Sequence, residues 1–193
     1  MPTRDSHLPL ADWLADFCRD AFEIEVSDRA ASVAELDAIE RELGAPLPPS
    51  YRHCLQQWDG AENFCYWKIF SIAELRNNLT IFCFQAESDE PLGAEEYFMY
   101  RGLPRGILVF GHQEGLADVA GFDTRSASGG EWPIVRYDHE TGELDAIAAD
   151  FGELMRDRAL DAIQDLELFI DPEDPATEER CEPLYELWRK RLS

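Results

Sequence analysis

Apolar residues recur at helical spacing through the first part of the chain. A stripe over residues 10–22 predicts an amphipathic helix that covers one side of the core. Ser32 and Glu35 form a capping box ahead of a second apolar stripe, and Gly44 provides the left-handed residue that ends such a helix. After a proline-rich break, Pro49 suits the first turn of a third helix. The N-terminal third is therefore expected to be mostly helical.

Beyond Gly60 the apolar spacing changes to the period of two that is typical of β-strands. The predicted strands are residues 64–72, 107–110, 118–122, 134–137 and 143–147. A hairpin is expected to join the last two strands, because Gly142 between them can take a positive φ. Helices followed by strands and then by more helices predict an α+β fold, in which a curved antiparallel sheet is packed by helices.

Two helices are expected after the sheet. Asp150 and Glu153 predict a further capping box, and the apolar residues that follow predict a long helix. Residues 171–177 hold three carboxylates and two prolines, which favour a linker. A last helix is expected at about residues 182–192, with Pro183 in its first turn.

The core residues of this fold follow from the apolar stripes of the helices and the alternation of the strands. Those expected to be buried are Tyr51, Leu55, Ile69, Phe110, Phe122, Ile134, Phe151 and Leu154.

Residues 77–100 stand apart because they contain no lysine or arginine. The acids toward the end of this segment are Glu87, Asp89, Glu90, Glu95 and Glu96. We expect a long acidic loop between strands, the kind of segment that carries function more often than packing.

The overall charge restricts the kinds of molecule that the protein is expected to bind. Forty Asp and Glu against 17 Lys and Arg give a net charge of −23, which disfavours nucleic acid and anionic membranes as ligands. The longest apolar stretches are far shorter than the roughly 20 residues that span a bilayer. The first ten residues lack the apolar core of a secretory signal. We expect a cytoplasmic protein.

No catalytic, cofactor or metal motif is found in the sequence. The glycine patterns that cradle phosphates and the nucleophile elbow of hydrolases do not occur. The five cysteines include no C-x-x-C pair, and the four histidines fall in different predicted elements. We expect reduced, mostly buried cysteines and a protein that is not an enzyme and needs no cofactor or metal.

Residues 36–60 resemble the opening motif of the SUKH superfamily, which contains fungal cell-wall-synthesis regulators and many bacterial immunity proteins. That motif is a helix ending in Leu-Gly, a Leu-Pro-x-x-Tyr corner and a second helix ending in Asn-Gly. The matching residues are Glu40, Leu43, Gly44, Leu47, Pro48, Tyr51, Leu55 and Gly60. Asp59 replaces the family asparagine, which keeps the turn but adds a charge. Residues 148–154 are similar to the helix that closes the family pattern.

The resemblance brackets residues 32–157 as a SUKH-like core domain. Residues 1–31 are then an N-terminal helix packed on that domain and residues 158–193 a helical C-terminal extension, all within a single domain. Bacterial members similar to this chain bind and neutralise toxins, often nucleases, without catalysis. The resemblance implies an immunity protein whose partner is a toxin, and the net charge of −23 predicts that this toxin is basic. We expect a monomer or weak dimer. The alternative is a regulatory or scaffold module that binds proteins and has no toxin partner.

The acidic segment is the predicted partner-binding surface. Its charged positions are Glu87, Asp89, Glu90, Glu95 and Glu96, and Tyr97 and Tyr100 offer aromatic anchors beside them. Interface hot spots favour tyrosine, and carboxylates around an anchor accelerate association with a basic partner.

Overall fold

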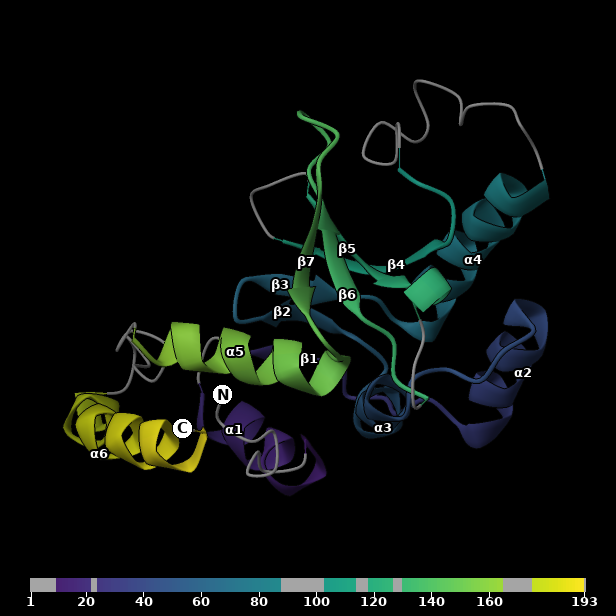
Figure 1. Cartoon of the computed structure of the whole chain (residues 1–193). Helices are drawn as coiled ribbons and strands as arrows, with labels where there is room; N and C mark the ends of the chain where they lie inside the picture. Colours follow the sequence, from purple (N-terminus) through teal and green to yellow (C-terminus); the bar gives the residue numbers. More distant parts are fainter. Residues whose placement is uncertain are drawn as a thin grey trace.

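Helices pack against one antiparallel sheet in the computed structural model, which describes residues 10–21, 24–87, 103–113, 118–126, 130–164 and 175–192 (Figure 1). The helices are η1 (Leu10–Asp12), α1 (Leu14–Asp20), α2 (Val33–Leu43), α3 (Pro49–Gln57), α4 (Ile72–Glu87), η3 (Thr124–Ser126), α5 (Phe151–Ile163) and α6 (Pro175–Leu192). The strands are β1 (Glu25–Val26), β2 (Ala61–Phe64), β3 (Trp67–Ile69), β4 (Ile107–Gln113), β5 (Val119–Asp123), β6 (Ile134–Tyr137) and β7 (Leu144–Ala148). These elements confirm the predicted α+β class.

The seven strands lie in sequence order from β1 to β7, and every neighbouring pair is antiparallel. The prediction of one strand over residues 64–72 is wrong. The chain instead forms the β2–β3 hairpin, which turns at Cys65 and Tyr66 with φ angles of 51° and 67°. Aromatic and β-branched residues run through this turn without glycine or proline, so no local signal marks the turn. The two-residue edge strand β1 is too short to produce an alternating pattern.

Alternate residues of the central strands enter two different apolar clusters. Leu108 and Phe110 of β4 belong to the main core, which also contains residues of α1, α2, α3, α5 and α6. Ile107 and Val109 belong to a second cluster on the other face of the sheet. Gly121 makes room for this second cluster, because a Cβ atom there would lie 2.4 Å from Ile107 Cγ2.

All eight residues expected in the core are buried, none with more than 2% of its surface exposed. The centre of the core is a group of four aromatic rings from α3, β4, β5 and α5, which are Tyr51, Phe110, Phe122 and Phe151. Their neighbouring centroids lie between 4.4 and 6.4 Å apart. The family motif residue Tyr51 therefore has a structural role in this chain.

Helix capping follows the sequence signals. Ser32 Oγ accepts from the backbone N–H of Glu35, whose carboxylate accepts from the N–H of Ser32, and Gly44 ends α2 with a φ of 75°. Asp150 likewise caps α5 by accepting from the N–H of Glu153. The Glu153 carboxylate binds the N–H of Ala149 rather than that of the cap residue, which is a variation on the predicted box.

The acidic segment does not begin as a loop. Residues 77–87 form the second part of α4, whose apolar residues Ile72, Leu75 and Leu79 are buried at helical spacing. A capping box of Ser71 and Glu74 starts this helix, and the sequence reading missed it. The segment 88–102 lies outside the described residues.

Helix α6 starts seven residues earlier than predicted, at Pro175, so residues 175–177 are not part of a linker. Proline is well accepted at the first position of a helix, where its missing N–H has no intrahelical partner. Pro183 consequently lies inside the helix. Trp188 of α6 is fully buried against Phe17 of α1, with ring centroids 5.1 Å apart, and its Nε1 donates to Asp20 at 3.0 Å. Helices α1 and α6 thus share the main core.

None of the helices in the described part of the chain is long and apolar enough to cross a membrane.

Candidate functional site

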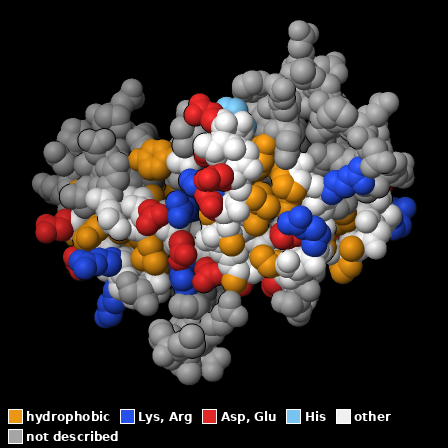
Figure 2. All heavy atoms as spheres, turned by 45° about the horizontal axis from the view of Figure 1, so that its top comes forward, with side chains coloured by type: hydrophobic (Ala, Val, Ile, Leu, Met, Phe, Trp, Pro, Cys, Tyr) orange, Lys and Arg blue, Asp and Glu red, His pale blue; other side chains and the backbone are white. Residues whose placement is uncertain are grey.

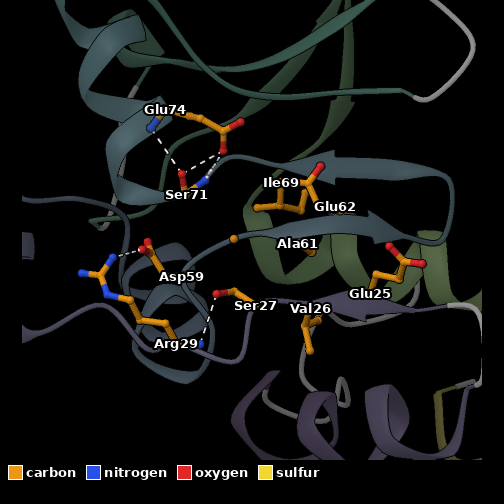
Figure 3. A pocket seen from close by; sticks show the side chains of 11 residues that line it. Glu25, Val26, Ser27, Arg29, Asp59, Ala61, Glu62, Ile69, Ser71 and Glu74 are labelled. Carbon is orange, nitrogen blue, oxygen red and sulfur yellow. Dashed lines mark hydrogen bonds and ion pairs between the residues drawn. The ribbon is translucent and has the colours of Figure 1, made fainter.

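A cleft of about 550 Å³ opens at the β1 edge of the sheet (Figure 3). It is lined by β1, by the corner between α3 and β2, by the end of β3 and by the first turn of α4. Four of its lining residues are acids, namely Glu25, Asp59, Glu62 and Glu74, whereas Arg29 is the basic one. Its volume lies within the roughly 300–1,000 Å³ range of binding pockets.

Asp59 fixes one wall of the cleft. This carboxylate is buried, and its Oδ1 accepts from the backbone N–H of Ile72 at 2.6 Å. Its Oδ2 accepts from Nη1 of Arg29 at 2.5 Å, while the other end of the same guanidinium pairs with Glu35. The charge that Asp59 adds to the family's Asn-Gly corner is thus balanced by Arg29. The residue ties α3, α4 and the segment before α2 together.

Lys68 fixes the opposite wall by bridging two acids. Its Nζ lies 2.9 Å from Glu62 and 2.9 Å from Glu74. Burial alone would raise the pKa of Glu74, but the hydrogen bonds from Lys68 and Ser71 outweigh it and lower that pKa below its usual value. The hydrogen bond to Glu74 in turn raises the pKa of Lys68. Both groups therefore stay charged near neutral pH.

Gly60 forms the floor between these walls. Its φ is 90°, and a Cβ atom there would lie 2.6 Å from the backbone N of Ser71 and 2.8 Å from the backbone O of Ile69. This close approach of two backbones requires glycine. The family motif position therefore shapes the cleft without contributing a functional group.

The charge on one face of the molecule is mixed rather than uniformly negative. On the face shown in Figure 2, Asp and Glu side chains alternate with Lys and Arg side chains around hydrophobic groups. A partner therefore meets local groups of carboxylates, and the cleft is one of them.

The predicted partner-binding residues fall at the limit of the described structure. Glu87 is the last residue of α4, and its side chain is outside the described part. Asp89, Glu90, Glu95, Glu96, Tyr97 and Tyr100 all lie in the segment that the structure does not describe. Their binding role stays a prediction.

The sequence analysis did not predict the cleft, because the residues that line it are far apart in the sequence. Of these residues, only the Asp59-Gly60 corner is part of a recognisable local pattern.

A second cluster, Asp118, Asp138 and His139, has ligand-type atoms within 4.8 Å of one another. Arg136 Nε lies 4.0 Å from Asp118, and His139 Nδ1 lies 3.7 Å from it. Asp138 also accepts from the backbone N–H groups of Glu140 and Thr141. The hydrogen bond from Thr141 is the largest cause of the lowered pKa of Asp138. These contacts give the cluster a structural role in the β6–β7 hairpin.

Three of the described thiols, those of Cys18, Cys54 and Cys65, are poorly suited to nucleophilic chemistry. Burial raises the pKa of Cys54 to about 12, and it also raises the pKa of Cys18 and of Cys65. Protonated thiols are weak nucleophiles. Cys54 is therefore a poor candidate for a catalytic nucleophile.

Comparison with known protein families identifies the class. The profile of the SMI1/KNR4 family (SUKH-1) matches residues 30–157. This match covers well over half of the 193 residues, so the chain belongs to that family. The matched range agrees with the predicted 32–157. No curated protein matches the chain significantly.

Proposed function

We propose that this chain is an immunity protein that neutralises a basic, nuclease-like bacterial toxin in the cytoplasm by direct contact and without catalysis. The observation that carries the proposal is the excess of carboxylates around the cleft, within a chain of net charge −23. Nucleases bind phosphate groups through basic surfaces, and opposite charge accelerates the association of such an enzyme with an acidic inhibitor. Membership of the SUKH-1 family is consistent with a protein-binding role.

The acidic segment is proposed as a further part of the toxin-binding surface. Its first part, residues 77–87, belongs to α4, the helix whose first turn lines the cleft. Its carboxylates at 87, 89, 90, 95 and 96 would set the rate of association, and Tyr97 or Tyr100 would supply a buried anchor that slows dissociation.

The test measures association with a purified basic toxin domain encoded beside this chain, at low and at high salt. Replacement of Glu87, Asp89, Glu90, Glu95 and Glu96 by amides should slow association at low salt by about tenfold and flatten its salt dependence. A matched control carries the amides at Glu140, Glu143 and Asp145, which are exposed in the β6–β7 hairpin. Each rate change is therefore compared per charge removed.

Two outcomes contradict parts of this proposal. Unchanged association of the amide variant at low salt would exclude the acidic segment as a contact surface. Failure of the unaltered chain to bind or inhibit the toxin, together with specific binding of a cellular regulator, would support the regulatory or scaffold alternative.

A further inference from the structure

We propose that the cleft receives one basic side chain, an arginine or a lysine, of the partner protein, and that Tyr66 packs against the partner beside it. This inference rests on the proposed function, because it names the surface through which this chain recognises a basic protein. It places the contact on β1, β2 and β3, within the part of the chain that the structure describes.

The charge balance of the cleft favours a cation. The carboxylates at or beside the cleft are those of Glu25, which lines it, and of the ion-paired Glu35, Asp59, Glu62 and Glu74. Among the described residues the four ion-paired carboxylates share two cations, because Arg29 is shared between Asp59 and Glu35, and Lys68 is shared between Glu62 and Glu74. Glu25 lies on the rim without an ion pair among the described residues. An incoming guanidinium or ammonium group would therefore meet uncompensated negative charge.

The apolar part of the lining favours a long side chain over a small inorganic cation. Val26, Ala61 and Ile69 contribute to the same cleft as the carboxylates. Arginine and lysine bury a hydrocarbon stem while their charged ends stay solvated or paired. Figure 3 shows Ser71 and Glu74 on one side and Glu25 and Val26 on the other. Such a site matches both halves of a basic side chain.

The walls of the cleft are held in place before any partner arrives. Asp59 binds the N–H of Ile72, the Ser71 hydroxyl and N–H both bind Glu74, and Gly60 lies against the backbone of β3. Little conformational entropy would be lost on binding, because these groups are already ordered. This preorganisation is what a specific pocket for one side chain requires.

The turn of the β2–β3 hairpin supplies an independent observation. Cys65 and Tyr66 both have positive φ, a conformation that glycine or asparagine adopts at lower cost. The side chain of Cys65 is buried in the main core, which accounts for its presence. Tyr66, in contrast, is one of three large hydrophobic residues that are exposed among the described residues, with 42% of its surface accessible. Strained residues are concentrated at functional sites, and tyrosine is a common interface anchor.

The β2–β3 hairpin connects Tyr66 with the cleft. Tyr66 lies at its tip, while Ala61 and Ile69 at its other end line the cleft. The strands between them are three and four residues long, so a short extended segment of a partner can contact both.

The experiment titrates the isotope-labelled full chain with acetyl-Ala-Leu-Arg-Leu-Ala-amide and follows its backbone amides by NMR. The control peptide carries citrulline, which has the shape of arginine but no charge. We expect the arginine peptide to shift the amides of Gly60, Ala61, Ser71 and Glu74, and the citrulline peptide to bind about tenfold more weakly. Equal binding of the two peptides, or shifts located elsewhere in the described structure, would overturn the proposal.

Two variants assign the contacts. Glu25→Gln with Glu62→Gln should weaken the arginine peptide about fivefold, whereas Glu140→Gln with Glu143→Gln, at the far edge of the sheet, should change binding less than about twofold. Tyr66→Gly relieves the positive φ, so it should leave the thermal midpoint unchanged or higher while weakening the peptide about threefold. Unchanged peptide affinity in both cleft and hairpin variants would reject the site.

The same variants separate this inference from the proposed function. If the unaltered chain and the cleft variants bind the toxin with equal affinity, the cleft is not the contact and the immunity role stands. If the chain binds the arginine peptide in the cleft but no toxin, the site stands and the immunity role fails.

Discussion

The aromatic core and the acidic cleft lie at the two ends of one short segment, residues 51–60, and they depend on different interactions. At one end, Tyr51 is fully buried among Phe110, Phe122 and Phe151. At the other end, the Asp59-Gly60 corner enters a cleft in which the stabilising contacts are ion pairs and caps. The core depends on close packing, which tolerates little change, whereas exposed charges contribute little to stability. A family fold can therefore keep its core and change its binding surface.

The largest effect is expected from a deletion in the core. Phe151→Ala removes a ring that contacts Tyr51, Phe110 and Phe122, so it should lower the free energy of unfolding by about 3–5 kcal/mol. The denaturant midpoint measures this loss, and Phe151→Leu serves as the conservative control with a smaller loss of about 1 kcal/mol. An unchanged midpoint for the alanine variant would show that the aromatic group is not the stabilising centre.

A substitution at Asp59 tests how much the contacts between the core and the cleft contribute to stability. Asp59→Ala leaves the buried N–H of Ile72 without its acceptor and removes the partner of Arg29, so it should cost about 2–3 kcal/mol. Arg29 is itself 53% exposed, so solvent screens much of the ion pair. Asp59→Asn restores the family residue and retains an acceptor oxygen, and it should cost about 1 kcal/mol or less. Equal losses for the two variants would indicate that the charge, not the hydrogen bond, holds the corner.

The difference between core and cleft also determines what could be predicted from the sequence. The buried residues were predicted correctly, because amphipathic periodicity and strand alternation are local signals. The capping box at Ser32 and Glu35 was likewise visible, since its partners are three residues apart. The cleft depends on contacts across long sequence separations, such as Arg29 with Asp59, and no local pattern reveals them. The β2–β3 turn was missed because its residues occupy positive φ without glycine.

Acid titration should give a smaller effect at Glu35, which pairs with Arg29 of the cleft. Hydrogen bonds from Ser32, followed by that from Arg29, lower the pKa of Glu35 from 4.5 to about 2. A carboxylate with a lowered folded-state pKa stabilises the fold above its unfolded-state pKa, and this contribution is lost as the pH falls from about 4.5 toward 2. Unfolding midpoints across that range should therefore depend less steeply on pH in Glu35→Gln than in the parent. Parallel curves would contradict this assignment.

The smallest effect on stability is expected at Glu25, on the cleft rim. The residue is exposed and has no ion pair among the described residues, so Glu25→Gln should change the free energy of unfolding by less than about 0.5 kcal/mol. Removal of its charge should nevertheless slow association with a basic partner at low salt, because rim charges act mainly on the encounter rate. The comparison is sharpest against Glu143→Gln, which removes an exposed acid at the far edge of the sheet. A loss of stability at Glu25 would mean that the cleft supports the fold, and equal rates for the two variants would mean that only the net charge steers the partner.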